Sequence, residues 1–348
     1  MAPGKKLIPL LIPATLFLIL FYLLVQLSRG IDTETGYSGN PIIDGWYADP
    51  EIIIFDSAYW IFPTFSAPFS EQVFMDAFSS PDLVSWTKHA RIVDTAIISW
   101  ADSAMWAPCS IEKEGKYYLF FAANDIQTSE SNWFDPEKHA GMKGGIGIAV
   151  AEQPGGPYKD HLGEPLIGEV INGAQPIDQF VFQDAGAYYI VYGGWGRCNM
   201  GMLNEDFTTL RPFDDGDLVK EITPEGYVEG PVIFKKKGTW YMMWSEGGWT
   251  NASYRVAYGI AHEVTGPYIR QGVVLEKDTT IATGAGHHSI VKIPGTDDWY
   301  IAYHRRPIPN EGRDHRVTCI ERLYFEEAGN ILPVKMTREG VKRRNIRQ

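Results

Sequence analysis

Three carboxylates and one histidine recur at similar places in this sequence of 348 residues. Each stands ten to twelve residues before a pair of aromatic residues that opens an apolar run. They are Asp49, Asp178, Glu229 and His287. A carboxyl group that is kept protonated can donate a proton, and a second one that stays ionised can accept a proton from water. Ionisable groups that converge in one cleft have shifted pKa values and mark reactive sites. The pattern therefore predicts acid–base chemistry, if the fold brings these residues together.

The aromatic pairs indicate which fold does so. They are Tyr59-Trp60, Tyr117-Tyr118, Tyr188-Tyr189, Trp240-Tyr241 and Trp299-Tyr300. Their starts are 52 to 71 residues apart, and a shorter apolar strand and a polar turn precede each pair. A unit of this length with several strands and no helical period is typical of a propeller blade. We therefore expect an all-β, five-bladed β-propeller. The alternative is a β-sandwich with aromatic-rich strands, which gives no reason for one pattern to recur.

A closed ring of blades places equivalent residues around one axis, where the innermost strands begin. The second unit has Trp106-Ala107-Pro108 near this position in place of an ionisable residue. Three carboxylates, a histidine and Trp106 are therefore expected to converge on one central pocket from distant parts of the chain. Such a pocket is where small ligands bind in most folds.

The N-terminal segment has the properties of a membrane anchor. Residues 7–27 carry no charge and are long enough to cross a bilayer core of about 30 Å as a helix. Lys5 and Lys6 precede them, which favours an N-terminus in the cytosol and an exported C-terminal domain. We expect a single-pass signal anchor in residues 1–30, a short stalk in residues 31–40 and the propeller in residues 41–348. The propeller would then lie in the lumen of the secretory pathway or outside the cell. Cleavage of the N-terminal segment would make the protein secreted.

Composition narrows the classes of partner. The formal net charge is −12 and the isoelectric point is about 5.2, so we expect no nucleic-acid partner, which would require a basic face. Aromatic residues make up 13% of the chain, and their rings suit stacking against the apolar faces of sugars. Three cysteines provide no disulfide framework and have no metal-ligand spacing, so buried free thiols are expected. We expect a monomer that binds carbohydrate.

The neighbours of the carboxylates suggest roles in cleaving a glycosidic bond. Glu229 lies between Val228 and the Gly230-Pro231 pair, and burial there would raise its pKa and suit it to donate a proton. Asp49 suits the ionised base, and Asp178 adds a charge that would raise the pKa of the acid further. Composition alone leaves the order of these roles open.

Five ordered segments carry a family resemblance. They are Tyr47-Ala48-Asp49-Pro50, Trp106-Ala107-Pro108, Gln175-Pro176-Ile177-Asp178, Val228-Glu229-Gly230-Pro231 and Gly284-Ala285-Gly286-His287-His288-Ser289. From residue 41 to about residue 336 the chain resembles glycoside hydrolase family 43. The resemblance implies a five-bladed propeller and hydrolysis with inversion. It also implies Asp49 as general base, Glu229 as general acid and Asp178 as the residue that adjusts the pKa of the acid. The related propeller fructosidases typically carry Arg-Asp-Pro and Asn-Asp-Pro-Asn segments, which are absent here.

The resemblance also implies three residues that bind substrate. His287 matches a histidine at the bottom of the pocket, beside either a calcium ion or a water at the propeller axis, in a reaction that requires no cofactor. Trp106 matches an aromatic residue that lines the pocket. Asp314-His315-Arg316-Val317 resembles the segment that supplies an arginine to the substrate, and we favour Arg316 over Arg313.

The expected substrates are plant-type polysaccharide side chains or oligosaccharides. The resemblance implies an α-L-arabinofuranosidase or a β-D-xylosidase. An insertion over residues 125–145 would wall off one side of the pocket, which favours exo action. Alternatives within the family are an exo-β-1,3-galactanase and an endo-arabinanase. A catalytically inactive, membrane-tethered propeller that only binds carbohydrate is the alternative from another class. The three carboxylates argue against it.

Overall fold

The computed structural model describes residues 36–125, 144–310 and 312–346. The expected membrane span, residues 7–27, and most of the insertion at residues 125–145 lie outside this part of the chain. Within the described residues, no helix is long and apolar enough to cross a membrane. One compact unit begins at Tyr37 and contains all the strands.

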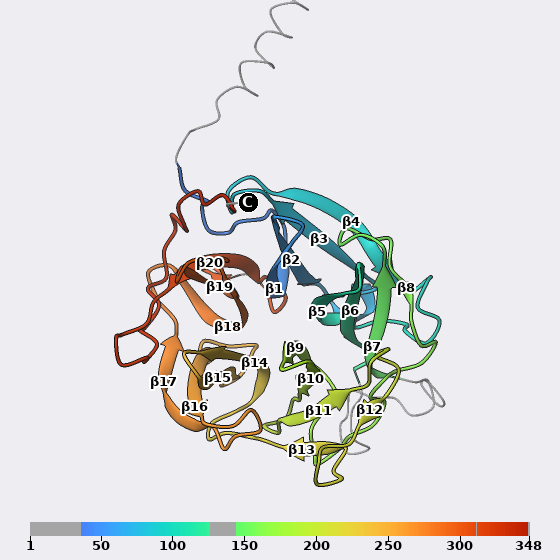
Figure 1. Ribbon diagram of the computed structural model, residues 1–348. Helices are drawn as coiled ribbons and strands as arrows, with labels where there is room; N and C mark the ends of the chain where they lie inside the picture. Colours follow the sequence, from blue (N-terminus) through green and yellow to red (C-terminus); the bar gives the residue numbers. More distant parts are fainter. Residues whose placement is uncertain (1–35, 126–143, 311, 347–348) are drawn as a thin grey trace, which may run out of the picture. The chain divides into compact units, whose positions relative to one another are not determined.

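Five antiparallel sheets surround a central axis, and each sheet is one blade (Figure 1). Blade 1 contains β1 (Tyr47–Phe55), β2 (Ala58–Phe65), β3 (Phe74–Ser80) and β4 (Thr87–Asp94), with the 3-10 helix η1 (Phe69–Glu71) between β2 and β3. Blade 2 contains β5 (Trp106–Lys113), β6 (Lys116–Ala123), β7 (Gly145–Ala151) and β8 (Lys159–Asp160). Blade 3 contains β9 (Phe180–Asp184), β10 (Ala187–Tyr192), β11 (Asn199–Leu203), β12 (Leu210–Arg211) and β13 (Val219–Glu221). Blade 4 contains β14 (Glu229–Lys236), β15 (Thr239–Glu246), β16 (Arg255–Ala261) and β17 (Ile269–Leu275). Blade 5 contains β18 (Ala282–Lys292), β19 (Trp299–Pro307) and β20 (Val317–Leu323). The predicted five-bladed propeller is confirmed.

The repeated aromatic pairs open the second strand of every blade, and the two faces of that strand explain their pattern. Side chains alternate between the faces of a strand, and each face of a blade packs against a neighbouring blade. In β2, Tyr59 and Ile61 belong to the core between blades 1 and 5, whereas Trp60 and Phe62 belong to the core between blades 1 and 2. A strand that is buried on both faces reads as a continuous apolar run. The aromatic pairs therefore recur once per blade, because the second strand of a blade packs against both neighbouring blades.

The ring is closed by residues near the two ends of the compact unit. The backbone N–H of Ser38 donates to the carbonyl of Val341 (2.8 Å), and that of Ile42 donates to Thr318 on β20 (3.0 Å). The buried Asn40 side chain donates to the Ile320 carbonyl (3.1 Å). Its Oδ1 accepts from the Ile320 N–H (2.9 Å). Blade 5 has three strands, and this segment covers its outer edge.

We predict that Asn40→Ala lowers the free energy of unfolding by about 2 kcal/mol, because it leaves buried backbone groups of β20 without partners. Urea denaturation monitored by tryptophan fluorescence measures the change. Asn330→Ala is the matched control, since the Asn330 side chain is exposed and bonds only to Glu326 across a turn. An unfolding midpoint equal to that of the control would show that Asn40 does not hold the ring closed.

Candidate active site

The backbone of the innermost strands turns the site residues toward the axis. Each of these strands has a residue in the left-handed region of φ, near the strand's start in blades 1 to 4 and in the middle of β18 in blade 5. These residues are Asp49 (φ 49°), Ala107 (φ 46°), Asp178 (φ 57°), Gly230 (φ 63°) and His287 (φ 35°). In β1, β5, β14 and β18 the pairing register shifts at this point. Such β-bulges redirect side chains, and a non-glycine residue in this conformation costs about 1–2 kcal/mol.

This geometry refines the alignment of the repeat. Asp49, Asp178 and His287 occupy the left-handed position, as the sequence suggests. In blade 4 that position belongs to Gly230, so Glu229 comes from one residue earlier. Gly230 also packs closely on the His287 ring, since a side-chain carbon there would lie 3.4 Å from two of its atoms.

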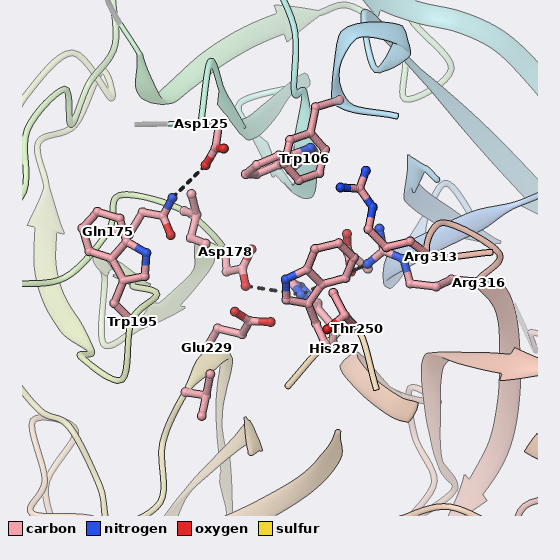
Figure 2. A pocket seen from close by; sticks show the side chains of 15 residues that line it. Trp106, Asp125, Gln175, Asp178, Trp195, Glu229, Thr250, His287, Arg313 and Arg316 are labelled. Atoms are coloured by element: carbon pink, nitrogen blue, oxygen red, sulfur yellow. Dashed lines mark hydrogen bonds and ion pairs between the residues drawn. The ribbon is translucent and has the colours of Figure 1, made fainter. Parts of the chain in front are cut away.

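The six residues singled out from the sequence line one cavity of about 430 Å³ (Figure 2). They are Asp49, Trp106, Asp178, Glu229, His287 and Arg316. They come from all five blades, and residues as distant as Asp49 and Arg316 are in contact. The structure thus brings the whole predicted set together at one end of the ring.

Asp49 is a buried carboxylate surrounded by cationic and polar groups. Its Oδ1 accepts from Arg316 Nη1 (3.2 Å) and lies 3.1 Å from His304 Nδ1 and 3.5 Å from His287 Nδ1. Burial by itself would raise the pKa of Asp49. The positive charge of Arg316 and the two imidazoles outweigh it and hold this pKa well below its usual range. Asp49 is therefore ionised throughout the neutral range.

Glu229 has the opposite electrostatic character. It is enclosed in the site, and Tyr254 Oη donates to its Oε1 (2.7 Å). Burial first, and then the charge of Asp178, raise the pKa of Glu229 to about 7. Two carboxyl groups in one cavity thus have widely separated pKa values, which is the condition for one acid and one base.

His287 bridges the carboxylates at the bottom of the cavity. Its Nδ1 lies 3.4 Å from Asp178 Oδ2 and 3.5 Å from Asp49 Oδ1 (Figure 2). Its backbone N–H donates to Ser245 Oγ (2.9 Å). Burial would lower the pKa of His287, but the charges of Asp178 and Asp49 dominate and raise it to about 9. At neutral pH the ring is a cation that holds the two carboxylates in place.

This environment does not suit a calcium ion bound to His287. A protonated imidazole has no lone pair for a metal, and calcium prefers oxygen ligands. Among the residues that the structure describes, no three His, Cys, Asp or Glu side chains are grouped so that they could hold a metal ion. The structure thus places the positive charge of the His287 imidazolium next to both carboxylates.

One wall of the cavity consists of the guanidinium groups of Arg313 and Arg316 and of two aromatic rings, Phe69 and Trp249, that the sequence analysis did not select. The guanidinium of Arg313 lies 4.6 Å from the centre of the Phe69 ring and 5.6 Å from that of Trp249. Arg316 lies 5.1 Å from the Trp249 ring. Both arginines line the cavity, with Arg316 buried against Asp49 and Arg313 nearer the solvent. Trp249 follows two glycines at the end of the fourth aromatic strand, and this position after a repeat strand is the signal that could have found it.

The opposite wall is polar and carries one exposed ring. Gln175 Nε2 donates to Asp125 Oδ1 (3.0 Å), and Trp195 is 40% exposed beside them (Figure 2). Gln175 stands in one of the segments that carry the family resemblance. Trp195 follows two glycines after the third aromatic strand, as Trp249 does after the fourth, so the same signal could have found it. Asp125 carries no such signal. Because the catalytic groups lie between two unlike walls, a bound sugar would meet aromatic and cationic groups on one side and polar groups on the other.

Comparisons with known proteins identify the family of the chain. The family model described as glycosyl hydrolases family 43 matches residues 38–331. The β-D-galactofuranosidase xynD of Aspergillus niger is 43% identical over 330 residues, which cover 90% of each chain. A xylosidase/arabinosidase of Bacteroides ovatus is 25% identical and covers 84% of this chain and 97% of its own. The crystal structure of a Bacillus subtilis arabinoxylan arabinofuranohydrolase has the same fold, with a TM-score of 0.71 at 24% identity over 89% of this chain and 70% of its own. The chain therefore belongs to glycoside hydrolase family 43 and is a glycosidase.

Proposed function

We propose that this glycosidase removes terminal furanose units from glycans with inversion, and that β-D-galactofuranosides are its first candidate substrates. The observation that carries the mechanism is the pairing of an ionised Asp49 with a Glu229 of raised pKa in one cavity. The observation that favours the sugar is the 43% identity, over 90% of both chains, to a β-D-galactofuranosidase. The sequence analysis did not include this sugar among its candidates.

α-L-Arabinofuranosides are the second candidate, in agreement with the expectation from the sequence. Relatives described as xylosidase/arabinosidase support them. The two sugars are chemically close, because L-arabinose has the configuration of D-galactose without its terminal carbon. The β-D-galactofuranosyl and α-L-arabinofuranosyl rings therefore present the same arrangement at the bond that breaks. A site that acts on one can approach the other in the same pose.

The residues divide the work of hydrolysis among them. Glu229, which is mostly protonated below about pH 7, gives its proton to the leaving oxygen. Asp49 takes a proton from the attacking water on the opposite side of the sugar. Asp178 raises the pKa of Glu229 through its charge and fixes His287. Arg316 holds the Asp49 carboxylate by a hydrogen bond. Inversion requires roughly 6.5–9.5 Å between the carboxyl groups of acid and base, so that the water fits between them.

The substrate prediction is tested with 4-nitrophenyl β-D-galactofuranoside, α-L-arabinofuranoside and β-D-xylopyranoside. We expect the highest kcat/KM on the galactofuranoside and the next highest on the arabinofuranoside, because the rings match. Oligosaccharides should release single sugars, and NMR should show them first as the inverted anomer. A preference for the xyloside, or release of longer fragments, would contradict the proposal in favour of xylosidase or endo activity. No turnover on any of them would support a propeller that only binds carbohydrate.

The catalytic roles are tested by Glu229→Gln and Asp49→Asn. Glu229→Gln should lower kcat/KM on oligosaccharides by about 10²–10⁴-fold, because the leaving oxygen is no longer protonated. It should impair nitrophenyl glycosides less, because nitrophenolate leaves without a proton. Asp49→Asn should impair both kinds of substrate to the same degree. Glu327→Gln, an exposed carboxyl outside the cavity, serves as the control. Equal losses on both kinds of substrate in Glu229→Gln would remove this residue from the role of acid.

The pH profile of kcat/KM on oligosaccharides should show which carboxyl group titrates. The acid must be protonated and the pKa of Glu229 is about 7, so the rate should fall up to tenfold per pH unit above pH 7. The rate should stay level between pH 5 and 6, because Asp49 is ionised there. Asp178→Asn removes a charge that raises the pKa of Glu229 and should move the alkaline limb to lower pH. Asp206→Asn, on the surface, should leave the limb where it is. An alkaline limb that does not move in Asp178→Asn would contradict the coupling.

A further inference from the structure

A partly exposed aromatic stack contains His315, which stands in the chain between the cavity-lining Arg313 and Arg316. Trp46 and His315 are parallel, with ring centres 4.3 Å apart and an angle of 8° between the planes. Trp46 nevertheless remains 39% exposed. It directly precedes β1, and neither ring belongs to the lining of the catalytic cavity. A tryptophan that is stacked on a second ring and left partly open to solvent offers a fixed aromatic face to a ligand.

Hydrogen bonds connect this stack to the catalytic cavity. The carbonyl of Trp46 accepts from the Ser66 N–H (2.9 Å). Ser66 Oγ donates to the Asp314 carbonyl (2.7 Å) and accepts from Arg316 Nε (2.9 Å). Arg316 in turn holds Asp49. The stack therefore belongs to the same end of the propeller as the cavity and is joined to its wall through one serine.

The stack is also supported from beneath. A side-chain carbon at Gly312 would lie 3.1–3.2 Å from three atoms of the His315 ring, so the glycine packs directly on this ring. The carbonyl of Gly312 accepts from Nη1 of the buried Arg306 (3.3 Å). The same guanidinium donates to the carbonyl of Trp249 (3.0 Å) in the cavity wall. Arg306 thus holds the backbone of both Gly312, which packs on His315, and Trp249, which lines the cavity. The His315 ring contacts Gly312 as well as Trp46.

We propose that Trp46 is a sugar-stacking subsite for the part of the glycan that extends outside the cavity. This inference rests on the proposed exo action, in which only the terminal unit enters the cavity. The remaining units are neutral rings with apolar C–H faces, and such faces pack against aromatic rings. Because His315 already holds the Trp46 ring, little side-chain freedom is lost on binding. The occupant is therefore a neutral sugar unit on the leaving-group side of the bond.

The experiment measures binding by calorimetry in the Glu229→Gln background, which prevents hydrolysis. The probes are a disaccharide and a pentasaccharide of β-D-galactofuranose, and the corresponding pair of α-1,5-L-arabinofuranose. Trp46→Ala should weaken binding of the pentasaccharide by about five- to tenfold and leave binding of the disaccharide within about twofold. Trp46→Phe should retain most of the affinity, because it keeps a flat ring. Tyr324→Ala is the matched control.

Tyr324 is an exposed aromatic residue (54%) that lies away from the cavity. It follows the end of β20 that pairs with Trp299, whereas the end of β20 nearer the cavity is Val317, which pairs with Arg305. Equal pentasaccharide affinity in Trp46→Ala and the control would overturn the subsite, as would equal losses on both lengths. Turnover of nitrophenyl glycosides by the otherwise native enzyme separates the two proposals. Turnover without any preference for the pentasaccharide overturns the subsite alone, whereas absent turnover overturns the proposed function.

Discussion

The balance of charge inside one buried cavity is the constraint on which the site depends. At neutral pH the carboxylates of Asp49 and Asp178 face the imidazolium of His287 and the guanidinium of Arg316. These four charges cancel, so the cluster that includes Glu229 is neutral only while Glu229 carries its proton. A negative charge on Glu229 would be buried beside Asp178 without a cation of its own, which is unfavourable at low dielectric. The charge balance of the cluster therefore favours the protonated form of Glu229, which is the form that the reaction needs.

The backbone makes this cluster possible at a local price in conformational energy. Asp49, Asp178 and His287 adopt left-handed φ values, which bring their side chains to the axis but are unfavourable outside glycine. Such strain persists only where surrounding packing fixes the chain. Each innermost strand pairs with a second strand that is buried on both faces, so every bulge lies beside two hydrophobic cores. The aromatic pairs therefore stabilise the strained backbone of the reactive residues by packing the strands next to it.

The sequence predicts those features of the site that repeat, and misses those that arise between blades. The aromatic pairs mark the second strand of each blade, and counting back from them reaches Asp49 and Asp178 correctly. In blade 4 the same count reaches Gly230, and Glu229 stands one residue before it, because the glycine occupies the left-handed position of the bulge. Tyr254 and His304 contact the two catalytic carboxyl groups across loops and blades, and His304 is 255 residues from Asp49. No local pattern encodes the His304 contact, since it joins blades 5 and 1 and exists only when the ring closes.

The walls of the cavity determine which sugar is bound, whereas the charged cluster determines which reaction takes place. The charged cluster acts on the acetal that all glycosides share, so it cannot by itself separate galactofuranosides from arabinofuranosides. These differ by one hydroxymethyl group, and an apolar wall that merely fits a carbon discriminates by only about 10–200-fold. A wall that bonds to the hydroxyl can discriminate far more strongly, because its polar groups lose a partner when the hydroxyl is missing. The two walls of this cavity differ in this respect: Phe69 and Trp249 can provide shape, whereas Asp125 and Gln175 can provide hydrogen bonds. Selectivity for the terminal carbon therefore depends on which wall it faces.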